Sequence, residues 1–183
     1  MGSSRRTGAQ LLGFLNDAAS RGISQALRSL NLHGLAGRPV EEVFRGLADY
    51  FCPEGGSLDV AIARDAFFRT VADIVEDDVT DLDNLNTDQV QAIFEVFTTH
   101  AIELRMYNEI GMRAITLPAD TAAIDNVQAQ LHDFITNGVS DALSQMGDRL
   151  PNLSQGQVPE FVDDVLERAF TVLAAMGDAE ANR

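Results

Sequence analysis

The amino terminus offers the most distinctive reactive group in this sequence. Gly2 follows the initiator methionine, and a residue this small lets methionine aminopeptidase remove Met1. The α-amine then exposed would have a pKa of about 7.7–8.0, far below that of lysine, so an appreciable fraction is neutral and nucleophilic near pH 7. All 13 basic residues are arginine, so this is the only good amine nucleophile in the chain. MGSS is also a common opening of expression-vector sequences, and that second interpretation stays open.

The chain contains three histidines and one cysteine, residue types often used as metal ligands, bases or nucleophiles. His33, His100 and His132 form no HExxH motif, and no pair of them has the spacing of metal ligands on one helix. We therefore predict structural roles for all three, and for His132 a hydrogen bond between helices. Cys52 has no second cysteine to pair with and precedes a proline, which favours a buried or turn cysteine over a nucleophile.

An acidic turn over residues 76–88 is a further candidate, because carboxylate-rich loops can bind calcium. In an EF-hand loop that started at Asp81, the fifth, sixth and twelfth positions require a ligand, a glycine and a glutamate. The sequence has Leu85, Asn86 and Ala92 there. We predict a solvated acidic loop, no metal site and no cofactor. The chain also lacks Walker A, GxGxxG and GxSxG patterns, so we predict that it is not an enzyme.

The charge of the chain is strongly negative and unevenly distributed. The formal net charge is −15, of which residues 1–45 contribute +3 and residues 46–183 contribute −18. An acidic body repels phosphate backbones, which argues against direct nucleic-acid binding. No window approaches the roughly 18 apolar residues that span a bilayer, and the start lacks the apolar core of a secretory signal. We expect a cytoplasmic protein.

The helix predicted over residues 86–118 must organise the other elements. Its apolar residues recur at helical spacing on two faces, Val90, Ile93, Phe94, Phe97, Ala101 and Leu104 on one and Ile102, Met106 and Ile110 on the other. A helix that is apolar on more than one side must be covered on more than one side, so we expect it to be central. Asn86 or Thr87 is expected to cap its start, with Gln89 or Val90 three residues on.

Helical patterns also occur near residues 11–18, 23–30, 40–51, 58–74, 120–143 and 158–173, and no stretch alternates as a strand does. The sequence therefore predicts an all-α fold with a single compact helical domain of about six or seven helices. We place that domain at residues 9–177. Residues 1–8 offer little to bury and are predicted to be a short flexible arm, and residues 178–183 a frayed tail.

Three segments resemble one family, the B proteins of bacterial Qat anti-phage defence systems (the QatB family). They are Cys52–Arg64 (CPEGGSLDVAIAR), Ala114–Pro118 (AITLP) and Gln128–Ile135 (QAQLHDFI). The MGSS opening is similar to the Met-Gly-Ser/Thr-Ser start of that family. The similarity covers most of the chain from about residue 8 onward.

The resemblance implies a non-enzymatic protein that works beside an ATPase, a TatD-like nuclease and a QueC-like, deazaguanine-synthase-like protein, QatC. In related systems such a synthase-like enzyme attaches a deazaguanine base to an N-terminal glycine. Carried onto this chain, Gly2 would be the modification site. Ser3, Ser4, Arg5 and Arg6 would contact the partner's active-site channel. The alternatives are a structural adaptor that bridges the ATPase and QatC without being modified, and a small-molecule-binding bundle.

Overall fold

The computed structural model describes residues 2–76, 82–112, 121–146 and 157–181, and these ranges are helical with short connections. Seven α-helices and two 3-10 turns are found in them, and no strand occurs in this part of the chain. The predicted all-α fold is therefore confirmed. In chain order the elements are α1 (Gly2–Arg21), α2 (Ile23–Ser29), η1 (His33–Leu35), α3 (Val40–Phe51), α4 (Leu58–Glu76), η2 (Leu82–Asn84), α5 (Thr87–Met112), α6 (Thr121–Met146) and α7 (Val158–Ala181).

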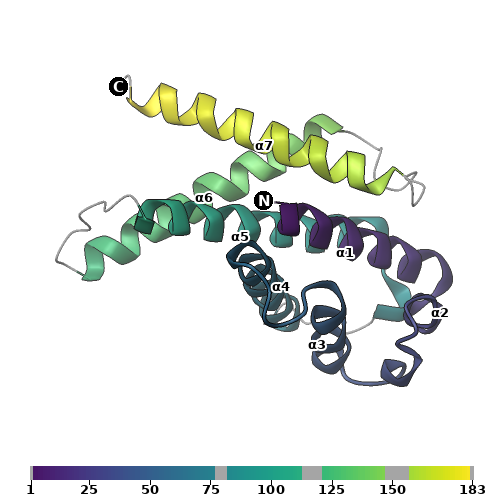
Figure 1. Cartoon of the computed structure of the whole chain (residues 1–183). Coiled ribbons are helices and arrows are strands. Elements are labelled where there is room, and N and C mark those ends of the chain that lie inside the picture. Colours follow the sequence, from purple (N-terminus) through teal and green to yellow (C-terminus); the bar gives the residue numbers. More distant parts are fainter. Residues whose placement is uncertain (1, 77–81, 113–120, 147–156, 182–183) are drawn as a thin grey trace.

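Helix α5 lies at the centre, as its two apolar faces predict. It packs against α1, α4 and α6, while α7 lies across α1 and α6 on the opposite side from α3 (Figure 1). Phe94, Phe97 and Ile102 of α5 are fully or almost fully buried. The predicted cap is also present: the Gln89 backbone N–H donates to Asn86 Oδ1 at 2.9 Å, and the Asn86 N–H donates to Gln89 Oε1 at 3.0 Å.

An aromatic cluster joins α3, α4 and α5 in the core. The ring centroid of Phe67 lies 5.9 Å from that of Phe44, 6.1 Å from that of Phe51 and 6.5 Å from that of Phe97. The rings meet at tilted or edge-on angles, which aromatic pairs favour. Phe67 therefore connects α3 to the central helix.

The first turns of α1 differ from the flexible arm predicted over residues 1–8. Residues 2–8 are helical, and the boundary predicted at residue 8 falls inside α1. The buried residues of this segment, Ser3, Ser4, Thr7 and Gly8, are all small. A Cβ atom on Gly8 would lie 3.1 Å from Phe97 Cε1 and 3.5 Å from Val162 Cγ1, so α1 approaches α5 and α7 closely at this glycine. Burial here comes from close backbone approach, which an apolar periodicity does not reveal.

At the other end, α7 continues to Ala181, through most of the predicted tail at residues 178–183. Asp81 and the segment 114–118, which ends at Pro118, lie outside the described residues.

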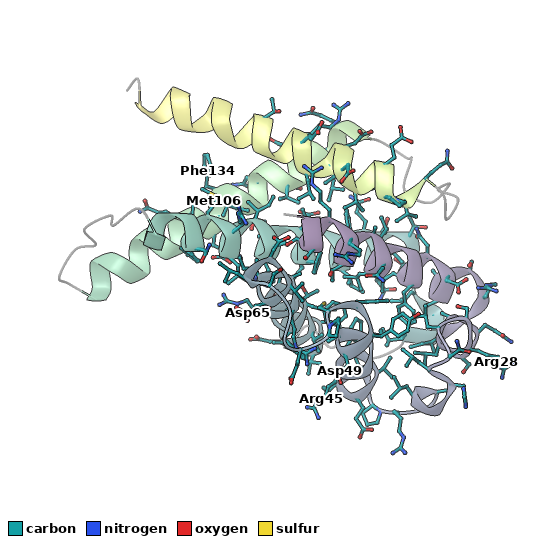
Figure 2. All side chains as sticks on the ribbon, in the orientation of Figure 1. Arg28, Arg45, Asp49, Asp65, Met106 and Phe134 are labelled. Atoms are coloured by element: carbon teal, nitrogen blue, oxygen red, sulfur yellow. The ribbon has the colours of Figure 1, made fainter. Side chains whose placement is uncertain are left out.

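Charged side chains such as Arg28, Arg45 and Asp49 project from the α2–α3 end, whereas Met106 of α5 and Phe134 of α6 are partly buried against the core (Figure 2). No helix in the described ranges combines the length and apolar character needed to span a bilayer.

Candidate functional site: the amino-terminal end of α1

The first turn of α1 is held against α4 by a side chain far away in the sequence. The Ser3 backbone N–H donates to Oδ2 of Asp59 at 2.7 Å. The first N–H groups of a helix have no partner within it, so Asp59 satisfies one of them from another helix. Gly2 is exposed, whereas Ser3 is buried and Ser4 is only 2% exposed. The predicted modification site is therefore at the surface, beside two buried serines.

The electrostatics of Asp59 favour its charged form. Burial of the carboxyl raises its pKa, but the Ser3 N–H bond and the positive charge of the amino terminus together hold the pKa below its usual value. Arg105 of α5 adds a second cation, with Nη1 3.8 Å from Asp59 Oδ1. The positive end of the α1 dipole lies in the same place. Asp59 thus carries a negative charge at the end of the chain where the α-amine is attached.

The two predicted arginine contacts have different surroundings. Arg5 Nη1 lies 3.1 Å from Asp163 Oδ1, an ion pair between α1 and α7 whose side chains are both partly exposed. Arg6 is exposed. Ser3 and Ser4 could meet a partner only if the first turn of α1 opened, whereas the arginines are accessible as they stand. Their roles as partner contacts stay predictions.

Two hollows flank this end of α1. The larger one, about 680 Å³, extends along α1 and is lined by residues that include Gly2, Arg5, Arg6, Tyr50 and Asp163. Tyr50 is 49% exposed. The smaller one, about 220 Å³, lies between Ser3, Arg6 and Thr7 on one side and Pro53–Gly56 with Val60 on the other. The amino-terminal turn is therefore reachable from both sides.

The segment from Cys52 to Arg64 contacts the amino-terminal end of α1. Thr7 Oγ1 lies 3.6 Å from Cys52 Sγ, within hydrogen-bonding distance of sulfur. Arg64 donates to the Cys52 carbonyl oxygen at 2.8 Å and to Asp49 Oδ1 at 2.7 Å, which fixes the turn after α3. Cys52 is buried, as predicted, and burial raises the pKa of its thiol. The thiol is therefore protonated and structural at neutral pH.

The comparison with family models gives one match. It is to QatB, described as a Qat anti-phage system associated protein, and it covers residues 1–173. This chain belongs to the QatB family. The matched range contains the amino-terminal turn of α1 as well as the three segments that resemble this family. Neither the curated proteins nor the solved structures gave a match to the chain.

A second polar cluster in this QatB-family chain lies between α4, α5 and α6. His100 Nε2 lies 2.7 Å from Asp73 Oδ2, and Glu103 Oε2 lies 3.5 Å from His100 Nδ1 and 3.6 Å from His132 Nδ1. His132 of α6 therefore approaches α5 at Glu103, but at 3.6 Å this contact is longer than the hydrogen bond between helices that the sequence predicted. His33 is exposed in η1. No group of three or more potential ligands among the described residues has an arrangement that could hold a metal ion.

Sequence reasoning identified Gly2 and the histidines but missed the carboxylates that lie near them, Asp59 and Asp73. Asp59 is 56 residues from Ser3, and Asp73 is 27 residues from His100. One signal for Asp59 was present, because it lies within the segment Cys52–Arg64 that resembles the family. No local spacing indicates that this segment packs against the amino terminus.

Proposed function

We propose that this chain is the non-catalytic member of a Qat anti-phage system and the protein substrate of a QueC-like partner, QatC. The acceptor is the α-amine of Gly2, and the helical body provides the surface to which QatC binds. Membership of the QatB family, with a match that includes the amino terminus, is the observation that carries this proposal. The ATPase and the TatD-like nuclease are proposed as further partners in the cytoplasm, without direct contact to nucleic acid.

The proposed reaction forms an amide. QatC activates the carboxylate of a deazaguanine with ATP, and the neutral Gly2 amine attacks the activated carbonyl carbon. A C–N bond forms, the C–O bond to the phosphate leaving group breaks, and the amine loses a proton to solvent. Because the chain has no lysine, no side-chain amine competes with Gly2.

The geometry around Gly2 supports this role. Gly2 is exposed, lies at the rim of the large hollow and lacks a side chain that could obstruct an enzyme's active site. Arg5 and Arg6 line the same hollow and are accessible to an acidic or phosphate-bearing surface. A channel that admits Gly2 must, however, accept an opened first turn, because Ser3 and Ser4 are buried in the folded helix.

The same burial favours the second candidate, an adaptor that bridges the ATPase and QatC and is not modified. The hydrogen bond from the Ser3 N–H to Asp59 holds the first turn of α1 against α4. In that case Gly2 is part of a folded scaffold, and its amine has no chemical role.

Gly2→Pro separates the two candidates in a phage-plating assay with the complete defence system. Proline is tolerated in the first turn of a helix, so the fold is retained, but its secondary amine is a poor substitute for a glycine acceptor. The substrate role predicts that protection is lost while QatC still co-purifies with the variant. Gly13→Ala is the matched control, because a Cβ at Gly13 meets nothing within 4 Å and protection should persist. Full protection by Gly2→Pro would establish the adaptor instead.

A further inference from the structure

Asp59 lies where it can control the chemical reactivity of the α-amine. A Cβ atom on Gly2 would lie 3.9 Å from Asp59 Oδ2, the same oxygen that accepts the Ser3 N–H at 2.7 Å. The nitrogen of Gly2, one peptide unit before that of Ser3, is therefore close to the carboxylate. Once Met1 is removed, this nitrogen is the α-amine.

We propose that Asp59 holds the Gly2 amine as an ammonium docked on α4, so that the amine becomes nucleophilic only when the first turn of α1 is released. An ammonium has no lone pair with which to attack a carbonyl. An adjacent carboxylate favours the charged form of an amine, and the contact is lost when the helix turn opens. The proposal takes its biological meaning from the proposed role of Gly2, but its chemistry needs no partner.

The charged groups around Asp59 are consistent with a carboxylate that faces the Gly2 amine. Arg105 of α5 approaches the other oxygen of Asp59, Oδ1, at 3.8 Å, which leaves Oδ2 to face the first turn. Arg5 is paired with Asp163 of α7, and Arg6 is exposed. The Ser3 N–H bond helps to keep the pKa of Asp59 below its usual value, so the carboxyl is charged at neutral pH.

Acylation would also change the docking itself. Formation of an amide at Gly2 removes the positive charge and leaves the Asp59 carboxylate without its ammonium partner. The first turn of a modified chain is then held by one interaction fewer than before. A partner that separates the first turn of α1 from α4 therefore meets a neutral, reactive amine. After acylation, the first turn binds α4 more weakly than before.

The test uses the absence of lysine. An N-hydroxysuccinimide ester of acetic acid acylates amines, and here the α-amine is the only one, so intact mass reads its modification directly. The purified full chain, with loss of Met1 verified by mass, is treated at pH 7. We expect Asp59→Asn to be acylated about three- to tenfold faster than wild type, since a tenfold change in neutral fraction corresponds to one pKa unit.

Asp65→Asn is the matched control, because it removes the same charge from α4 at an exposed carboxylate paired with Arg69 at 3.5 Å (Figure 2). Its acylation rate should equal that of wild type. The pH profile of wild-type acylation provides an independent reading, with a midpoint expected above the ordinary range of about 7.7–8.0. Equal rates for Asp59→Asn and wild type, or a midpoint within the ordinary range, would overturn the proposal and leave modification by QatC still to be judged on its own evidence.

Discussion

His100 on α5 and Asp73 on α4 are joined by a 2.7 Å contact between Nε2 and Oδ2, and His100 is only 7% exposed. On its other side His100 faces the buried carboxylate of Glu103, which His132 also approaches from α6. One side chain therefore links the central helix to α4 and places its second ring nitrogen near the Glu103 carboxylate.

His100→Ala should lower the free energy of unfolding by about 1–3 kcal/mol, because it removes the 2.7 Å hydrogen bond with Asp73 and truncates a buried side chain. Urea denaturation followed by circular dichroism measures this. His33→Ala is the control, since His33 is exposed, and it should change stability by no more than about 0.5 kcal/mol. Equal effects for the two variants would mean that the polar cluster contributes nothing to the packing of α4 and α5.

At Gly8, helix α1 lies close to both α5 and α7. Gly8→Leu should destabilise the protein by about 1–3 kcal/mol, because the new side chain would overlap Phe97 and Val162. Gly13→Ala, in the same helix but facing open space, should instead stabilise by about 0.5–1 kcal/mol through its helix propensity. If Gly8→Leu were as stable as wild type by urea denaturation, residues 2–8 would not pack as described.

The depressed pKa of Asp59 gives a pH dependence with a defined sign. A carboxyl group whose pKa is lower in the folded state stabilises that state above its unfolded pKa, near 3.9, and ceases to do so as the pH falls through the folded value. Hydrogen-exchange protection of the Ser3–Thr7 amides should therefore be steady between about pH 5 and 7 and fall below about pH 4. Asp59→Asn should show weaker protection and no such step, and an identical profile would contradict the docked turn.

The buried thiol of Cys52 should be unreactive in the folded protein, because only the thiolate is nucleophilic and burial raises the pKa. Ellman's reagent at pH 8 should react at least about tenfold more slowly with native protein than with protein unfolded in urea. Thr7→Val removes the hydroxyl that lies 3.6 Å from the sulfur and should leave the thiol protected by burial. Rapid reaction of the native chain would show that the Cys52 turn is open.

The sequence predicted those features that depend on neighbours along the chain. The two apolar faces of α5 predicted its central place, and the spacing of Asn86 and Gln89 predicted a cap that the structure contains. The first turn of α1 could not be predicted in this way, because Ser3 bonds to Asp59 of α4 and Gly8 lies against α5 and α7, all far away in the sequence. Periodicity detects apolar stripes, and small polar residues at a close helix crossing produce none.

The same distinction between local and long-range contacts applies to the residues of the candidate site. Gly2 was identified from its chemistry and from the family resemblance, since its amine is distinctive in a chain without lysine. Asp59 was not, because its importance follows from a contact across 56 residues.

The most direct test of the account is the intact mass of the chain after co-expression with QatC, followed by fragmentation of its amino-terminal peptide. The account predicts loss of Met1 and a mass increase equal to one deazaguanine amide, localised to Gly2. An unmodified Gly2 in a chain that still forms a stable complex with QatC would contradict it and leave the helical body as the functional part.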